Sequence, residues 1–267
     1  MSSSKKKATP KLPFDSLIDH FKANLYLFET TLTQIEGFVL KYPQFIDLIH
    51  SYKFRVKDPE HLRQKLIRKQ SDAKAKKLPF NITKEKLFEE VNDLAGFRII
   101  HLFTHQFEQI DKTLRKIFLE EKWNIIEVEA KTWDEETSRY FQSIGINVAS
   151  KPNLNLYTSV HYIIAPNRKT GITCEIQVRT LADEVWGEVD HQINYPSKSP
   201  SVSCQNQIKV LARLTSSCSR LIDSIFNTHK EFVGNGDKIN IQSNPKKSAS
   251  RKTKAAKSST KSTVKKR

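Results

Sequence analysis

Apolar residues in the first part of the chain recur with the spacing that puts them on one face of an α-helix. The repeat runs from Phe14 to Ile35, and it predicts one long amphipathic helix that continues to His50 beyond a break near Pro43. Similar repeats, with Pro59 in the first turn of the next helix, predict further helices over residues 59–70, 84–91, 107–121, 181–193 and 205–229. The lysine-rich stretch 71–82 is expected to be a loop.

Other stretches are short and rich in β-branched and aromatic residues, which is typical of β-strands. The strands predicted in this way span residues 96–103, 123–130, 157–165 and 172–180. A turn over 167–171 joins the last two strands, so we expect them to form an antiparallel hairpin. Residues 52–57 form a basic segment that is irregular or extended. Helices that precede and flank a mixed sheet predict an α/β or α+β fold.

The basic charge of the chain is concentrated at its two ends. Residues 241–267 carry ten Lys or Arg and no acid, and residues 1–11 carry four lysines and no acid. Subtracting these fourteen charges from the formal +16 leaves +2 for residues 12–240. Neither end holds enough apolar surface to offset the loss of chain entropy on folding. We therefore expect one domain over 12–240, with flanking helices, between a disordered basic N-terminus and a disordered lysine-rich tail.

The sequence also limits the location of the protein. No apolar run approaches the roughly eighteen residues that a membrane span needs, and the first lysines are not followed by the apolar stretch of a secretory signal. The three cysteines do not have the spacing of metal ligands, so they indicate reduced thiols in a cytoplasmic protein without a membrane partner.

A first group of charged residues is basic. Arg55 and Lys57 are followed by Lys65, Arg68 and Lys69. Cations at this density suit a polyphosphate, because each phosphate oxygen accepts charge-assisted hydrogen bonds. The alternative is a solvated basic face of a helix.

A second group surrounds the start of the first long strand. Asp93 precedes the strand, Gly96 allows close approach of a ligand, and Arg98 follows. Mg²⁺ prefers one or two carboxylates together with phosphate oxygens and water, so Asp93 is a candidate metal ligand. The alternative is that Asp93 caps a turn and Arg98 lies on the surface.

A third group lies on the predicted hairpin, where residues two apart share one face of a strand. The polar face defined by this rule carries Tyr157, Ser159, His161, Glu175, Gln177 and Arg179. The positions between them are mostly apolar. We interpret the polar face as the lining of a site, and the alternative is the solvated side of an antiparallel sheet.

Taken in order, these motifs resemble the synthetase domain of the RelA/SpoT family. The motifs that carry the resemblance are Arg55-x-Lys57 with Lys65, Asp93-Leu-Ala-Gly-x-Arg98, Tyr157-x-Ser-x-His161, Glu175-Ile-Gln-x-Arg-Thr180, and Trp186 with His191 and Tyr195. The resemblance implies a nucleotidyltransferase-like fold, with a mixed sheet of about five strands flanked by helices. It also implies transfer of the β,γ-pyrophosphate of ATP to the 3′-hydroxyl of GDP or GTP, which makes (p)ppGpp-type alarmones.

The resemblance is to the short, stand-alone synthetases of that family. The histidines do not form the metal pattern of the family's separate hydrolase domain, which we expect to be absent. The short synthetases are often oligomeric, so a homo-oligomer is also expected.

The resemblance also implies roles for the donor-binding residues. Arg55 and Arg98 resemble the pair that sandwiches the adenine of ATP, a task that suits planar guanidinium groups. Lys57 and Lys65 would bind the ATP phosphates.

The catalytic roles implied by the resemblance belong to three residues. Asp93 and Glu175 would bind Mg²⁺, and Glu175 would help to deprotonate the attacking hydroxyl. His161 would contact phosphate or order the acceptor. Such chemistry depends mainly on positioning and on neutralising developing charge.

The acceptor would stack its base on Tyr157, with Gln177 and Arg179 beside it. Here the sequence departs from the family's pattern, because Asn153 replaces a lysine that contacts the acceptor's 5′ phosphates. We expect Lys151 and Asn155 to contribute to binding there. The other departures are Leu156 for a glycine, Pro196 for a lysine and His61 for a serine. These departures leave the identity of the acceptor open, whereas the donor-binding and metal-binding residues of the family are retained.

Two other functions stay open. A toxin-type pyrophosphokinase would use the same chemistry on the tRNA 3′ end or on adenosine nucleotides. The lysine-rich tail would give affinity for the phosphate backbone of a nucleic acid, although it lacks aromatic residues for base stacking. The third possibility is an inactive nucleotide- or RNA-binding module, against which the presence of Arg55, Asp93, Arg98 and Glu175 argues.

Overall fold

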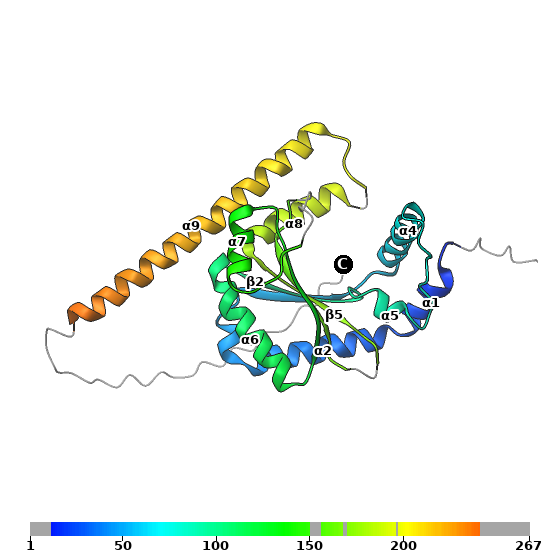
Figure 1. The fold of residues 1–267 in the computed structure, drawn as a ribbon, viewed down its shortest axis with the longest axis horizontal. Helices are drawn as coiled ribbons and strands as arrows, with labels where there is room; N and C mark the ends of the chain where they lie inside the picture. Colours follow the sequence, from blue (N-terminus) through cyan, green and yellow to red (C-terminus); the bar gives the residue numbers. More distant parts are fainter. Residues whose placement is uncertain (1–11, 150–155, 168–169, 196, 241–267) are drawn as a thin grey trace, which may run out of the picture. The chain divides into compact units, whose positions relative to one another are not determined.

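A five-stranded mixed sheet lies at the centre of the computed structural model, which describes residues 12–149, 156–167, 170–195 and 197–240 (Figure 1). The strands are β1 (Ser51–Val56), β2 (Ala95–His101), β3 (Asn124–Lys131), β4 (Ser159–Ala165) and β5 (Cys174–Thr180). Their order in the sheet is β1-β2-β5-β4-β3. Strands β2 and β5 run parallel, and the other neighbouring pairs are antiparallel. The predicted class, the five-stranded mixed sheet and the antiparallel hairpin are confirmed.

One face of the sheet is apolar and packs against helices. Phe97 and Ile99 on β2, and Ile176 and Val178 on β5, are at most 1% exposed. Burial of such apolar side chains is the main driving force for folding. Figure 1 shows the covering helices on one side of the sheet: α1 (Asp15–Ala23), α2 (Leu25–Lys41), α5 (Leu87–Glu90) and α6 (Phe107–Glu120).

The N-terminal helix is divided where the apolar pattern predicted one continuous helix. Asn24 separates α1 from α2 and has a non-helical backbone, with φ −115° and ψ 14°. Its side-chain amide donates to the carbonyl of His20 at 2.8 Å. This local hydrogen bond offers the backbone an alternative to the helix, so the prediction of a single helix is wrong. A short helix, α3 (Pro43–Ile46), follows the predicted break.

Helix α4 (Pro59–Ala75) begins as predicted but is longer. Pro59 occupies its first turn, and the Asp58 carboxylate caps it by accepting from two backbone N–H groups at 2.8 and 3.1 Å. The helix includes residues 71–75, which the sequence predicted to be a loop. The predicted irregular or extended segment before it is strand β1.

The remaining elements surround the sheet and the end of the chain. A short 3₁₀ turn over Thr104–Gln106 and helix α7 (Glu135–Ser143) did not follow from the apolar pattern. Helices α8 (Leu181–Asn194) and α9 (Val202–Asn240) were predicted from the apolar pattern, although α9 is longer than predicted. Contacts divide the chain into a unit that ends at Ile225 and a second unit from Phe226 onward. The predicted disordered ends, 1–11 and 241–267, lie outside the described residues.

None of the described helices combines the length and the apolar character that a membrane span needs. The cysteines Cys174, Cys204 and Cys218 are all free thiols.

Candidate functional site

Charged and polar side chains form a row across the sheet face opposite the main core. Directly paired residues on neighbouring strands share a face. The register pairs Lys53 of β1 with Arg98 of β2, Arg98 with Gln177 of β5, and Gln177 with His161 of β4. The polar face predicted for the hairpin therefore extends over four strands.

A cleft of about 570 Å³ lies over this polar face, a volume typical of small-molecule sites. Its other wall comes from α8 and the residue that follows it, from Trp186 to Tyr195. The predicted site residues that line the cleft are Arg55, Lys57, Asp93, Arg98, Tyr157, Glu175, Gln177 and Arg179. The predicted residues Lys151 and Asn155 lie outside the described residues.

Asp93 is held by two lysines in the turn before β2. The Nζ atoms of Lys57 and Lys65 lie 2.8 Å from its two carboxylate oxygens. Burial works to raise the pKa of Asp93, but the two ammonium groups outweigh it and hold the pKa below its ordinary value. Asp93 is therefore ionised at neutral pH, and the predicted phosphate-binding lysines contact the predicted metal ligand.

Glu175 is held from two sides in the same cleft. Its Oε1 lies 2.9 Å from Nδ1 of His161, and its Oε2 accepts from the Gln177 amide at 2.7 Å. Burial works to raise the pKa of Glu175, but the hydrogen bond and charge of His161 outweigh it, and the pKa is lowered. The Nε2 atom of His161 is buried and has no hydrogen-bond partner within the described chain. His161 itself is not among the residues that line the cleft.

A residue that sequence reasoning missed, Glu184, connects three cations at the wall of the cleft. This carboxylate on α8 forms ion pairs with Lys53, Arg98 and Arg179. Burial works to raise its pKa, but these cations, Arg179 first, lower it to about 2. The signal in the sequence was the spacing of Glu184, Glu188 and His191 on one helix face, where an apolar stripe is usual for a packed helix.

A continuous set of hydrogen bonds joins this wall to the candidate metal ligand. Arg98 Nη1 donates to Glu184 at 3.0 Å, and Arg98 Nε donates to the Gln177 amide oxygen at 3.3 Å. The Gln177 amide nitrogen in turn donates to Glu175. Gln177 is thereby oriented by both neighbours and connects the predicted donor-binding arginine to the predicted catalytic carboxylate.

Tyr157 lies just before β4 and closes one side of the cleft. The Arg179 guanidinium carbon is 5.6 Å from the centre of its ring, and the His161 ring is 5.8 Å away. Arg179 is 4% exposed, so it lies behind the tyrosine more than it faces solvent. Gly187 makes room for it, because a Cβ at that position would be 2.6 Å from Arg179 Nη1. Ser159, predicted on the same face, instead donates to the carbonyl of Val178 at 3.2 Å.

Near Arg55, α4 and the end of α8 meet through three aromatic rings. The ring of His191 stacks on that of Tyr195 with 4.6 Å between the centroids. The ring of His61 contacts the same tyrosine edge-on, with 4.7 Å between the centroids. Burial, and then the charge of Arg55, lower the pKa of His191. His61, which departs from the family's serine, thus contacts the residue that ends the last motif.

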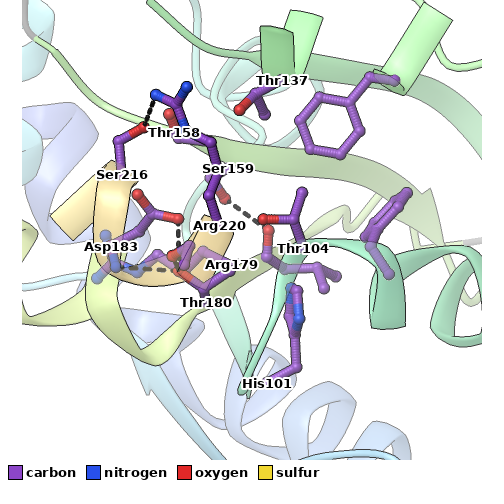
Figure 2. A pocket seen from close by; sticks show the side chains of 14 residues that line it. His101, Thr104, Thr137, Thr158, Ser159, Arg179, Thr180, Asp183, Ser216 and Arg220 are labelled. Atoms are coloured by element: carbon purple, nitrogen blue, oxygen red, sulfur yellow. Dashed lines mark hydrogen bonds between the residues drawn. The ribbon is translucent and has the colours of Figure 1, made fainter. Parts of the chain in front are cut away.

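A second cavity lies beside the cleft, bounded by Arg179 and Ser159, and measures about 20 Å³ (Figure 2). That is room for about one water molecule. Figure 2 shows hydroxyl groups of Thr104, Thr137, Thr158 and Thr180 around it. Burial raises the pKa of Asp183 to about 6 and lowers that of His101 to about 4. This cavity is too small for a nucleotide.

The chemistry of the cleft fits Mg²⁺ bound together with a phosphate ligand. In the described part of the chain, no group of three or more His, Cys, Asp or Glu side chains could hold a metal alone. Mg²⁺ needs only one or two carboxylates when phosphate oxygens complete its shell. Asp93 and Glu175 both line the cleft and have lowered pKa values, so they supply such carboxylates.

The sequence was also compared with known proteins. Residues 54–200, more than half of the chain, match the family described as a region found in RelA/SpoT proteins. A curated relative is the GTP pyrophosphokinase YwaC of Bacillus subtilis (strain 168). It is 27% identical over 191 residues, which cover 67% of this chain and 77% of the relative.

Solved structures share the fold at low sequence identity. A GTP pyrophosphokinase family protein from Streptococcus pneumoniae matches with a TM-score of 0.55 and 19% identity, over 83% of this chain and 97% of that one. The small alarmone synthetase 1 from Bacillus subtilis, bound to its product pppGpp, matches with a TM-score of 0.52 and 19% identity. That match covers 82% of this chain and 99% of the synthetase.

Proposed function

We propose, because the chain belongs to the RelA/SpoT family, that it transfers the β,γ-pyrophosphate of ATP to the 3′-hydroxyl of a guanine nucleotide and so makes (p)ppGpp-type alarmones. The observation that carries the proposal is the meeting of Asp93 with Lys57 and Lys65, at 2.8 Å each, in the cleft that also holds Glu175. Carboxylates and cations combined in this way suit a bound metal and a polyphosphate together.

In the donor half of the site, ATP binds beside the two arginines that line the cleft. Arg55 and Arg98 hold the adenine between planar guanidinium groups. Lys57 and Lys65 bind the phosphates, exchanging their ion pairs with Asp93 for pairs with phosphate oxygens. The lysines would be available for this exchange because Asp93 would hold Mg²⁺ in their place.

Asp93 and Glu175 are the residues that would hold Mg²⁺. When bound, the ion would neutralise charge on the transferred phosphates. The ionised state of both carboxylates at neutral pH supports this assignment, since a metal ligand must be deprotonated.

In the acceptor half, the guanine base stacks on Tyr157. The 3′-oxygen of the acceptor forms a bond to the β-phosphorus of ATP, and the bond from that phosphorus to the bridging α,β-oxygen breaks. AMP leaves, and the hydroxyl proton passes to Glu175, which hydrogen-bonds with His161 and Gln177. His161 orders the acceptor side of the site by holding Glu175 through its Nδ1, at 2.9 Å. Gln177 and Arg179 support these groups from beside the site.

The names of the relatives favour a guanine acceptor, because one is a GTP pyrophosphokinase and another was solved with pppGpp. The decisive test is incubation of the full chain with ATP labelled in the γ-phosphate, Mg²⁺, and GDP, GTP, AMP or total tRNA in separate reactions. We expect label on GDP or GTP with release of one AMP per product. Asp93→Asn is the inactive control, and Asp72→Asn, an exposed change on α4, is the active one.

Other outcomes of this test contradict the proposal. Label on tRNA or on AMP alone would assign the toxin-type or adenosine reaction. Binding of nucleotides without transfer to any acceptor would make the protein a binding module.

A further inference from the structure

A second, smaller hydrophobic cluster lies apart from the main core. It contains the buried residues Trp186, Ile208 and Ala212. Partly buried residues pack against it: Trp133, Leu156, Tyr157 and Leu211. We call this set the second core. It joins α8, the first turns of α9, and the segment that leads into β4.

Tyr157 is shared by the second core and the cleft. Its ring lies 6.5 Å from the ring of Trp186, and both residues line the cleft. Trp186 is in turn fixed to α9, because its Nε1 donates to the carbonyl of Ile208 at 3.1 Å. The tyrosine that lines the cleft is therefore close to Trp186, which is itself held by α9.

Leu156, directly before this tyrosine, has an unusual backbone. Its φ is +56°, in the left-handed region that disfavours residues with a Cβ. The side chain packs in the second core nonetheless. A conformation of this kind persists where the surrounding contacts hold it, so packing of Leu156 sets the position from which Tyr157 enters the cleft.

Helix α9 supplies much of this support without entering the cleft. Ile208, Leu211 and Ala212 belong to the second core, whereas the residues of α9 whose side chains are described, 202–233, are not among those that line the cleft. Leu214, on the next turn, is 62% exposed and points away from the second core. Two leucines three residues apart on one helix thus differ, since Leu211 packs in the second core and Leu214 is exposed.

From these contacts we propose that the second core positions Tyr157 for the acceptor, with Leu156 and Leu211 as positioning residues, so that α9 sets acceptor affinity from outside the cleft. This inference rests on the proposed function. We expect the two substrates to respond differently, because Lys57 and Lys65 on the donor side pair with Asp93, whereas Tyr157 packs in the second core.

The test is steady-state kinetics of the full chain with ATP and GDP varied in turn. Leu211→Ala and Leu156→Ala are expected to raise the KM for GDP on the order of tenfold, within the range for a weakened stacking platform. They should change the KM for ATP less than about twofold. Leu214→Ala is the matched control and should leave both KM values unchanged. If Leu156→Ala does not fold, Leu211→Val gives the same test with a smaller rise.

Each result decides one claim. An equal rise of both KM values in Leu211→Ala, or no rise for GDP, overturns the positioning role. The positioning role is also overturned if Leu214→Ala raises the KM for GDP as much as Leu211→Ala does. A wild-type protein that transfers nothing to GDP or GTP refutes the proposed function first, and the inference falls with it.

Discussion

At the scale of single residues, the cleft is organised by carboxylates that hold cations and donors in place. Asp93 pairs with two lysines, and Glu184 pairs with Lys53 and two arginines. Without these carboxylates, the cations of the polar face would repel one another at short range. The basic groups that a polyphosphate needs are thus already positioned before a ligand binds, which reduces the cost of ordering them on binding.

Removing either candidate metal ligand is the first prediction. Asp93→Asn and Glu175→Gln should each lower kcat by orders of magnitude, because loss of a ligand charge weakens the metal and the charged transition state together. Turnover with ATP and GDP across Mg²⁺ concentrations measures this. Circular dichroism checks the fold of each variant. Near-normal turnover in either folded variant would remove that residue from the metal site.

Glu184 and Glu188 offer a matched pair for a prediction on stability. The pKa of Glu184 is lowered from 4.5 to about 2, so its ion pairs stabilise the fold above its ordinary pKa. That stability is lost as the pH falls toward 2. Glu184→Gln should lower the free energy of unfolding by up to about 3 kcal/mol at pH 6, and by much less near pH 2.

Denaturant unfolding of the two variants at both pH values tests this prediction. Glu188 pairs with the same Lys53 and Arg98, but its side chain is 49% exposed. Glu188→Gln should therefore change stability by less than about 1 kcal/mol. A loss for Glu184→Gln that does not depend on pH would mean that packing, and not charge, is what the residue contributes.

At the scale of elements, α8 does two things for the cleft. It carries Glu184 and Trp186 toward the sheet, and it approaches β5 closely because Gly187 has no Cβ. The guanidinium group of Arg179, on β5, occupies the space that a Cβ at position 187 would need. The helix that follows the last strand is thus part of the site itself.

Gly187→Ala should disturb the site while the fold survives. The new methyl would meet Arg179 Nη1 at 2.6 Å, so the arginine has to move away from Tyr157 and Glu184. We expect a rise of about tenfold in the KM for the acceptor, comparable with loss of part of a stacking platform. Substrate kinetics and thermal unfolding are the measurements.

Gly37→Ala is the control for this prediction. Gly37 lies in α2, and nothing is within 4 Å of its hypothetical Cβ. The change should raise stability by up to about 1 kcal/mol, because alanine favours a helix more than glycine does. Kinetics should be unchanged. If Gly187→Ala behaves like Gly37→Ala, the contact with Arg179 has no functional weight.

At the scale of the whole molecule, charge and chemistry are separated along the chain. The lysine-rich tail 241–267 carries ten Lys or Arg, whereas residues 12–240 carry a formal charge of only +2. The motifs and the cleft all belong to the unit that ends at Ile225. Activity on a free nucleotide and affinity for a nucleic acid are therefore expected to depend on different parts of the chain.

Deletion of residues 241–267 tests this separation. Synthesis from free GDP should be nearly unchanged, because the tail carries none of the motifs. RNA affinity, measured at two salt concentrations with and without the tail, should fall on deletion. Its salt dependence should flatten, since fewer counterions are released. Loss of synthesis from free GDP on deletion would mean that the tail is part of the folded enzyme.

Sequence spacing predicted most of the helices and strands, and it predicted most of the side chains that line the cleft. The period of two predicted the hairpin and placed His161, Glu175 and Gln177 on one face, as the register shows. The apolar helical pattern missed the break at Asn24, where a single polar side chain ends α1. It also missed the helix over 135–143, which forms from a short polar sequence. Both depend on local hydrogen bonds that apolar periodicity does not report.

What the sequence determined by itself follows from distances along the chain: which residues share a face of a strand or helix, that Pro59 lies in the first turn of a helix, and where the charge lies. Only the tertiary structure decided that Glu184 meets Lys53 and Arg98, and that Leu156 and Leu211 both pack in the second core. These partners are far apart in sequence, so no local spacing relates them. They meet because the packing of α8 and α9 against the rest of the fold leaves a single arrangement for their side chains.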